Sequence, residues 1–586
     1  MKLDQIASDT PSTEKLIVDW DVPISMDDGL TLRGDVFRPV ESGEYPVILA
    51  YGPYAKGLVF REGFRSRWEK LIDEHPEALE GSSGRYANYE NVDPEKWVPE
   101  GYVCVRVDSR GTGRSPGYLC LFQARETHDL YECIEWAARQ PWSNGKVGLS
   151  GISYLAMNQW HVASLQPPHL AAMIAWEGAA DFYRDATFHG GIRTTFWDRL
   201  VPRAILRTQH GVGERATTNP NTGDLVAGPE TLELEELEMN RCDFVEEIRS
   251  HPFDDDWHKE RSPDWSMIQV PFLSSGNWGG HGLHLRGNIE AFVRAASSQK
   301  WLEVHGLEHW THFYTNYGVA LQKEFFEYYL KGVDNGWPNR PRVQLQIRFR
   351  DRFEVRGEQE WPIARTRWTR LHLDASDMSL SWDPIAAPSS IQYNPLEEAL
   401  TFLSPPLEAQ TEITGPVSSR VNISSLSTDA DLFLILHVFD DSGNEILFEG
   451  AQGVPAPIAQ GWLRASHRRL DSSLTTEYRP YHVHASVEPL TSGTIYPSDV
   501  EVWPTSIVIP QGHRIGLTIQ GVDYVTGSVV GSENVGPILH DDPRDRPPDV
   551  YGAPVTLHCG GNNDSYVLLP VIPPETRSSH DGRGTR

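Results

Sequence analysis

Positive charge is scarce in this sequence. The 586 residues include 52 Lys and Arg against 81 Asp and Glu, so the formal net charge is -29. A surface of that sign repels phosphate backbones and anionic membranes. The composition therefore argues against nucleic acid and membrane surfaces as partners.

Cysteine and long hydrophobic runs are also scarce. The chain has five scattered cysteines without the CxxC spacing of a metal or redox site: Cys104, Cys120, Cys133, Cys242 and Cys559. We interpret them as reduced core thiols. No segment approaches about 18 consecutive apolar residues, and the N-terminal MKLDQIASDT is polar where a signal peptide would be apolar. These absences predict a cytoplasmic protein.

Cofactor motifs are missing as well. The Gly-rich segment NWGGHGLHLRGN lacks the GxxxxGK[ST] spacing of a phosphate loop, so we interpret it as a tight turn. Five histidines lie in this segment or after it, but none forms the HExxH pattern of a zinc site: His281, His284, His305, His309 and His312. We therefore expect no cofactor and no metal.

The first half of the chain alternates strand and helix patterns. VPISMDDGLTLRGDVFRPV predicts an antiparallel hairpin, and the apolar runs PVILAYGPY, YVCVRVD and KVGLSG are separated by segments with helical periodicity. Strands that alternate with helices indicate a parallel sheet covered by helices. We expect this α/β domain to comprise residues 1–180 and 267–335.

Two other segments differ from this pattern. The polar insertion 181–266 is rich in helix formers and predicts a helical cap over the sheet. Short alternating strands separated by Gly, Pro, Asn and Asp predict an all-β sandwich of the jelly-roll, galactose-binding-like type over 336–572. We expect 573–586 to be a disordered tail. The sequence leaves a homodimer open.

Ser153 is the first candidate for chemistry. Gly151-Ile152-Ser153 lies where a strand ends and a helix begins, the position of a nucleophile elbow. The partial positive charge of the helix N-terminus there favours a developing oxyanion. GxSxG is not matched because Leu155 replaces its last glycine, so Ser153 as a simple helix cap is the alternative.

A serine nucleophile needs a base to take its proton. The segment VHGLEHWTHFYT follows the strand KWLEVHG and supplies His309 and His312. A loop after this strand can carry an imidazole over Ser153. Either histidine could instead be a buried structural residue.

Several motifs, in order, resemble the cocaine esterase and X-prolyl dipeptidyl-peptidase family of α/β hydrolases (CocE/NonD-like). They are GPYAK, VDSRGTGRSPG, QPWSNGKVGLSGISYLA and HPFDDDWHKERSP, followed by HWTH. The resemblance covers nearly the whole chain and implies an α/β-hydrolase fold with serine hydrolase activity. It maps the base to His312 and places His309 where the family has a proline.

The resemblance also implies the oxyanion hole and exposes two departures. The hydroxyl of Tyr54 and the backbone N–H of Tyr154 would form the hole, whereas the alternative for Tyr54 is a core aromatic. Ala156 stands where the family motif ends in glycine. Gly279 stands where the family has the triad aspartate, so the usual acid is missing.

Another carboxylate is therefore expected, because neutralising the acid of a triad costs about 10⁴ in rate. The prediction is Glu177, at the end of the strand AAMIAWEG, with Asp181 and Glu308 as alternatives. Each of the three could instead be a solvated or capping carboxylate.

These residues predict a serine esterase or acyl hydrolase acting on a small-molecule ester or amide. His312 would deprotonate Ser153 and Glu177 would orient His312, with an acyl-enzyme as intermediate. Trp197, Trp278 and His309 are the expected pocket residues. The alternatives are a non-hydrolytic acyl transferase or lactone-forming enzyme, and a catalytically dead protein that binds through its β-sandwich.

Overall fold

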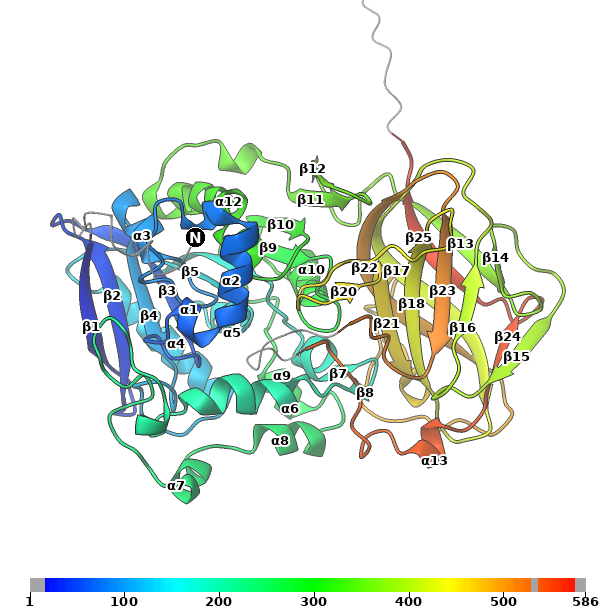
Figure 1. Ribbon diagram of the computed structural model, residues 1–586, viewed down its shortest axis with the longest axis horizontal. Helices are drawn as coiled ribbons and strands as arrows, with labels where there is room; N and C mark the ends of the chain where they lie inside the picture. Colours follow the sequence, from blue (N-terminus) through cyan, green and yellow to red (C-terminus); the bar gives the residue numbers. More distant parts are fainter. Residues whose placement is uncertain (1–15, 528–535, 575–586) are drawn as a thin grey trace, which may run out of the picture.

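The structure is a computed structural model that describes residues 16–527 and 536–574. The segment MKLDQIASDT and most of the expected tail 573–586 lie outside these residues. Figure 1 shows an α/β half, blue to green, beside a β-rich half, yellow to red. Among the described residues, no helix is both long enough and apolar enough to cross a bilayer.

The sheet of the α/β half has ten strands within the described residues. Their order is β1-β2-β4-β3-β5-β6-β9-β10-β11-β12. The outer strands β1 (Leu16–Ser25) and β2 (Thr31–Pro39) form the predicted antiparallel hairpin. The parallel strands are β3 (Tyr45–Gly52), β4 (Val103–Asp108), β5 (Ser143–Ile152), β6 (Leu170–Trp176), β9 (Phe272–Asn277), β10 (Lys300–His305) and β11 (Val343–Arg348).

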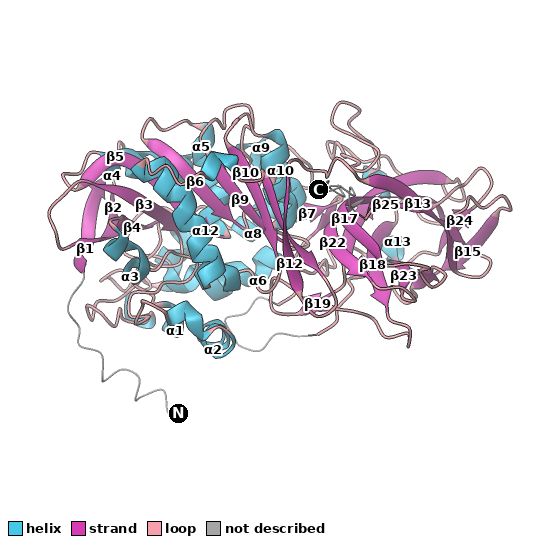
Figure 2. Ribbon diagram, turned by 90° about the horizontal axis from the view of Figure 1, so that it is seen from above, coloured by secondary structure: helices cyan, strands magenta, loops and turns pink. Residues whose placement is uncertain are grey.

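Helices connect and cover these strands, as the alternating pattern predicts. The longer ones are α2 (Arg65–Glu74), α4 (Ala124–Ala138), α5 (Tyr154–Ser164), α10 (Leu285–Arg294) and α12 (Asn316–Phe326), and the short ones here are α1 (Phe60–Gly63), α3 (Pro94–Trp97) and α11 (Thr311–Tyr314). Figure 2 shows helices flanking the strands of this half. The parallel strands are buried on both faces, which explains their continuous apolar runs.

The sheet continues beyond residue 335, where the sequence pattern places the start of the β domain. β11 pairs in parallel with β10, and β12 (Phe353–Glu358) pairs with β11 in antiparallel fashion. Alternating polarity identifies a strand but not its partner, so the assignment of these two strands required the tertiary structure.

Residues 181–266 form short helices and turns. They include the π-helical turns Phe182–Thr187 and Val201–Ile205, the helices α6 (Phe196–Leu200), α7 (Leu234–Met239), α8 (Phe244–Ser250) and α9 (Asp256–Glu260), and the small hairpin of β7 (Phe188–His189) with β8 (Ile192–Arg193). In Figure 1 they lie along the lower side of the molecule, and β7 and β8 reach the β-rich half.

The β-rich half is a separate domain. Its main sheet has eleven strands among the described residues, in the order β15-β24-β17-β22-β21-β18-β23-β16-β14-β13-β25, with β17 also pairing with β25. The strands are β13 (Arg367–Asp374), β14 (Ser379–Ser381), β15 (Ser389–Tyr393), β16 (Leu400–Leu403), β17 (Thr411–Ser425), β18 (Asp431–Phe439), β21 (Ala459–Arg464), β22 (Tyr496–Ile509), β23 (Arg514–Gln520), β24 (Val555–Cys559) and β25 (Tyr566–Ile572); α13 (Pro548–Tyr551) precedes β24. They enclose an apolar core of their own.

Two features join the halves. A cluster of buried apolar side chains combines Trp278 and Ile192 with Phe433, Trp462 and Trp503 of the β domain. In addition, the loop between β19 (Phe448–Glu449) and β20 (Pro455–Ala456) contacts the α/β half directly, because the Ala451 N–H donates to the Gly279 carbonyl at 3.1 Å. The β domain therefore borders the loops at the carboxyl ends of the parallel strands.

Candidate active site

Ser153 occupies the predicted strand-to-helix turn. β5 ends at Ile152, Ser153 has φ 57° and ψ −118°, and α5 begins at Tyr154. This sparsely populated conformation is that of a nucleophile elbow, where strain holds the serine hydroxyl away from the helix. A Cβ at Gly151 would lie 2.5 Å from the Leu155 Cβ, so the turn needs glycine there.

The hydroxyl of Tyr54 lies near the side chain of Ser153. Burial raises the pKa of Tyr54 well above 10, so the phenol stays protonated and can donate. Asp108 fixes the loop that carries it, because its two carboxylate oxygens accept from the backbone N–H groups of Lys56 at 2.6 Å and Arg114 at 2.8 Å. Asp108 of the VDSRGTGRSPG motif thus holds the backbone of the GPYAK motif, which contains Tyr54, in place.

Tyr154 has its side chain directed away from Ser153. Its hydroxyl donates to the Glu126 carboxylate at 2.8 Å, and its ring stacks on Phe122 with centroids 4.1 Å apart. Its backbone N–H is the first of α5, and the first N–H groups of a helix have no acceptor within the helix. This N–H is therefore suited to an oxyanion.

His312 lies on the β10–β11 side of the site. Its Nδ1 is 3.4 Å from the Thr315 hydroxyl, and its Nε2 accepts from the Gln346 amide at 3.3 Å. Its ring packs against His305 and Tyr317. Among the described residues, no hydrogen bond joins His312 to Ser153 or to Glu177.

His309 is bound on both ring nitrogens and only 3% exposed. Its Nδ1 is 3.1 Å from the Ala451 carbonyl oxygen, and its Nε2 is 2.9 Å from the Tyr89 hydroxyl and 3.1 Å from Glu90 Oε1. A carbonyl can only accept, so Nδ1 carries the proton, and the lone pair of Nε2 in the neutral ring accepts from the Tyr89 hydroxyl. Burial lowers the pKa of His309 well below 6.5, which keeps the ring neutral.

The neighbours of His309 also contact residues around Ser153. The Glu90 carbonyl accepts from the N–H of Ile152, the residue before Ser153, at 3.1 Å. The ring of Tyr89 lies 6.3 Å from the ring of Tyr54, centroid to centroid. His309, unlike His312, is thus connected to the elbow through both Tyr89 and Glu90.

Glu177 is buried beside the elbow but pairs with a different histidine. Its Oε1 accepts from the Asn277 amide at 3.0 Å and lies 3.1 Å from His305 Nε2. The other nitrogen of His305 is 2.8 Å from Glu303. Burial lowers the pKa of His305, but the two carboxylates outweigh this effect and raise it to about 9. The Glu177–His312 contact expected from the sequence is not present.

The missing aspartate has a structural explanation. A Cβ at Gly279 would lie 2.8 Å from the Gly450 Cα and 2.9 Å from the Ala451 nitrogen. The β19–β20 loop therefore occupies the space of a side chain at this position. The same loop supplies the Ala451 carbonyl that accepts from His309.

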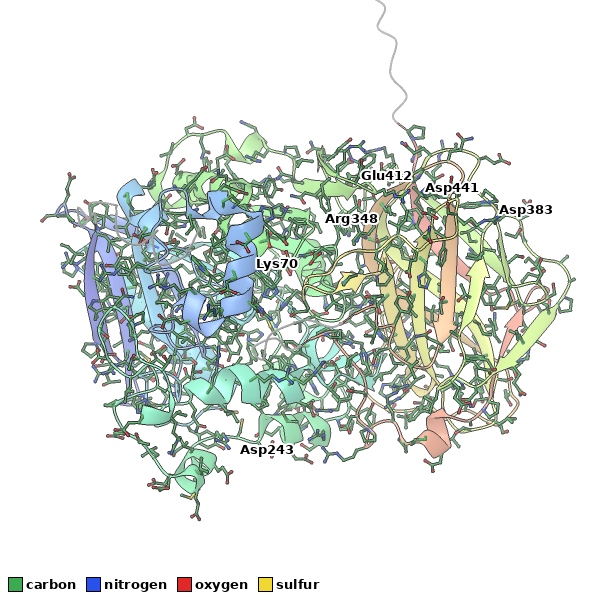
Figure 3. All side chains as sticks on the ribbon, in the orientation of Figure 1. Lys70, Asp243, Arg348, Asp383, Glu412 and Asp441 are labelled. Atoms are coloured by element: carbon green, nitrogen blue, oxygen red, sulfur yellow. The ribbon has the colours of Figure 1, made fainter. Side chains whose placement is uncertain are left out.

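Lys70 on α2 links the segment before His309 to β19 through two ion pairs. Its ammonium group lies 2.7 Å from Glu449 at the end of β19 and also pairs with Glu308, which precedes His309. Figure 3 shows Lys70 on α2. Glu308 accepts from the Thr311 hydroxyl as well, so this alternative acid has structural partners.

The remaining predicted residues lie in packed positions. Asp181 caps the turn Phe182–Thr187 and binds Arg184 and Tyr481. Trp197 donates its indole N–H to the Ala186 carbonyl, and Trp278 donates to the Gln346 carbonyl. Trp197 shares an apolar cluster with Tyr54 and Tyr154, whereas Trp278 packs at the contact with the β domain.

Three residues of this site were not predicted. Tyr89 and Glu90 lie in NYENVDP, a segment without a motif, and Ala451 contributes only its backbone. Glu90 also has a positive φ of 65°, a backbone conformation that its residue type does not predict. No pattern in the sequence could have identified these three contacts.

Comparison with known proteins covers both halves of the chain. A family model described as X-Pro dipeptidyl-peptidase (S15 family) matches residues 28–314. A second, described as X-Pro dipeptidyl-peptidase C-terminal non-catalytic domain, matches residues 335–568.

Individual relatives agree with these matches. The cocaine esterase of Rhodococcus sp. is 22% identical over 94% of this chain and 98% of its own length. The crystal structure of a CocE/NonD family hydrolase from Staphylococcus aureus is 32% identical, with a TM-score of 0.82, over 95% of this chain and 94% of that chain. An α-amino acid ester hydrolase structure, 16% identical over 96% of this chain and 97% of that chain, shares the fold with a TM-score of 0.64. These names give no support to a transferase, a lactone-forming enzyme or a dead binding protein.

Proposed function

Since this chain belongs to the CocE/NonD family of hydrolases, we propose that it cleaves a small-molecule ester or amide through an acyl-enzyme on Ser153. The observation that carries the proposal is the strained turn at Ser153 with the Tyr54 hydroxyl near it. A fluorophosphonate tests it, because this reagent forms a covalent bond only with an activated serine. Mass spectrometry would then locate the label on Ser153.

In the first half-reaction, His309 Nε2 takes the proton of the Ser153 hydroxyl as its oxygen attacks the substrate carbonyl carbon. The carbonyl π electrons move to the oxygen, which becomes an oxyanion. Tyr54 O–H and Tyr154 N–H donate to it. When the tetrahedral intermediate collapses, His309 returns the proton to the leaving alcohol or amine, and the acyl group stays on Ser153.

In the second half-reaction, water replaces the serine. His309 takes a proton from water, the resulting hydroxide attacks the acyl carbon, and the same donors hold the oxyanion. The C–O bond to Ser153 then breaks, and Ser153 recovers its proton from His309. The free acid is released.

Our choice of His309 as the base rests on its contacts. The Ala451 carbonyl holds Nδ1–H and thereby leaves Nε2 as the acceptor, which is the role of the acid in orienting a triad histidine. A carbonyl carries only a partial negative charge, so it stabilises a protonated imidazole less than a carboxylate does. The buried carboxyl of Glu90, 3.1 Å from Nε2, can supply the remaining stabilisation when the ring is protonated. His312, the base implied by the family motif, stays the alternative.

Replacement of Tyr54 by phenylalanine tests the oxyanion hole. We expect kcat to fall roughly 10²- to 10³-fold with little change in KM, because the hydroxyl donates mainly to charge that develops in the transition state. Steady-state hydrolysis of a short-chain nitrophenyl ester measures both constants. An unchanged kcat would show that Tyr54 is only a packed aromatic.

Paired replacements of Glu90 and Glu177 by glutamine separate the two buried acids. We expect Glu90→Gln to lower kcat roughly 10²-fold, because Glu90 is the carboxyl in contact with the His309 ring. Glu177→Gln should cost less and instead lower the pKa of His305, which NMR titration of its ring protons would detect. The reverse ranking of the two kcat values would make Glu177 the acid, as the sequence predicts.

The fold of the β domain, the partners and the location of the protein are also part of what we propose. The long antiparallel strands β17, β18, β22 and β23 around one apolar core support a jelly-roll sandwich for the β domain. The net charge of -29 supports a partner other than nucleic acid or a membrane surface. Five cysteines without a disulfide support a cytoplasmic location.

A further inference from the structure

Two cysteines far apart in the sequence lie side by side between the α/β domain and the insertion. The N–H of Leu119 donates to the Asn240 carbonyl at 2.9 Å, and the N–H of Cys242 donates to the Leu119 carbonyl at 3.0 Å. These bonds form a parallel bridge that pairs Leu119 with Arg241. Cys120 and Cys242 are the next pair in the same register.

This register suits a disulfide. Neighbouring strands lie about 4.8 Å apart, and disulfides join Cα atoms about 4.4–6.8 Å apart. The sulfurs are already close, because both sulfurs and a carboxylate oxygen of Glu247 fall within 4.8 Å of one another and the Cys242 thiol interacts with that of Cys120. A bond between the two sulfurs therefore needs little movement of the backbone.

The surroundings favour a reactive thiolate at Cys120. The hydrogen bond from Cys242 lowers the pKa of Cys120, and the same bond raises the pKa of Cys242. The Arg261 guanidinium lies 3.9 Å from the Cys120 sulfur, and positive charge stabilises a thiolate. Cys242 is half-buried, so reagents can reach the pair from its side.

The other three cysteines lack this setting. Cys104, Cys133 and Cys559 are buried in separate apolar clusters. Burial raises the pKa of each thiol, which makes it unreactive.

A metal ion fits the pair less well than a disulfide. Glu247 would be the third ligand, but it already accepts from the Trp257 indole N–H at 3.3 Å and pairs with Arg261 at 3.9 Å. A guanidinium this close to two of the three ligands repels a cation. The same charge favours the thiolate that begins disulfide exchange.

We propose that Cys120 and Cys242 are a redox modification site that closes reversibly to a disulfide by exchange with a low-molecular-weight disulfide. The Cys120 thiolate attacks one sulfur of the small disulfide, whose S–S bond breaks and releases one thiolate. Cys242, as its proton leaves to solvent, then attacks the Cys120 sulfur and expels the second thiolate. Two protein thiols are oxidised and one small disulfide is reduced to two thiols.

Closure would tie the insertion to the active-site half of the molecule. Cys120 lies two residues before Phe122, whose ring stacks on Tyr154 beside Ser153. Cys242 lies just before α8 in the insertion. The crosslink would close a long loop of chain and should raise the Tm of the whole protein.

The test exposes the full chain to glutathione disulfide, blocks free thiols by alkylation and maps the peptides by mass spectrometry. We expect a peptide pair linked through Cys120 and Cys242, lighter by two hydrogen atoms than the separate peptides and released by dithiothreitol. The oxidised protein should have a higher Tm, and the other three cysteines should be alkylated only after unfolding.

Cys242→Ser is the matched variant, since the half-buried position accepts a serine hydroxyl. It should stop at a mixed disulfide of Cys120 with glutathione and show no rise in Tm. Recovery of both cysteines as free thiols at saturating glutathione disulfide would overturn the proposal. So would thiols that resist oxidation because the purified protein holds zinc and that become reactive once a chelator removes it.

Discussion

Ser153→Ala should lower kcat for a short-chain nitrophenyl ester by roughly 10⁵-fold, because an acyl-enzyme cannot form without the hydroxyl. Fluorophosphonate labelling should disappear in the same variant. The backbone of the elbow carries its strain whichever side chain is present, so the fold should persist. Far-UV circular dichroism and the Tm would verify this.

Ser150→Ala is the matched control on the same strand. The hydroxyl of Ser150 lies 3.3 Å from the Gln322 side chain, on the side of α12 rather than at the elbow. This variant should keep both labelling and hydrolysis. If Ser153→Ala still hydrolysed the ester at the wild-type rate, or if the wild-type protein resisted the label, the serine hydrolase mechanism would be wrong for this chain.

The second large effect is expected at His309. His309→Asn should lower kcat by roughly 10⁴-fold or more, because the base for Ser153 is lost while the asparagine amide can still donate to the Ala451 carbonyl. His312→Asn should change kcat less than roughly 10-fold, since its ring contacts Thr315 and Gln346 rather than the elbow. Measured with the same ester, the pair of variants identifies the base.

The opposite result would also be informative. If His312→Asn abolished hydrolysis and His309→Asn did not, the base would be the histidine that the family motif implies. The loop after β10 would then have to rearrange before catalysis, because His312 faces β11 in this structure. The rate of fluorophosphonate labelling in each variant would show whether the loss lies in activation of Ser153.

Much of the α/β half was predictable because its signals are local. Alternating apolar segments mark the strands and their connecting helices, and a glycine before a serine at a strand end marks the elbow. Tyr54 was identified through the family resemblance, which the short motif GPYAK carries. Each of these signals lies within about ten residues of the feature that it describes.

The partners of the imidazoles were not predictable from local signals. Gly279 predicted the loss of the triad aspartate, but the group that binds Nδ1 of His309 is a backbone carbonyl at Ala451, and every residue except proline presents the same backbone groups. Glu177 was chosen for its strand-end position, yet in the folded chain His305 is nearer to it than either candidate base. Which acceptor pairs with which histidine depends on the distances between loops that follow different strands.

The sequence by itself determined the strand and helix pattern, the turn at Ser153 and the chemical class that this turn implies. Only the tertiary structure decided that β11 and β12 extend the first sheet and that His309 rather than His312 is linked to the elbow through Tyr89 and Glu90. It also decided that a β-domain loop fills the space beside Gly279. The reason is physical: a periodic pattern encodes which face of a segment is buried, whereas the contacts of a catalytic ring depend on how distant segments pack.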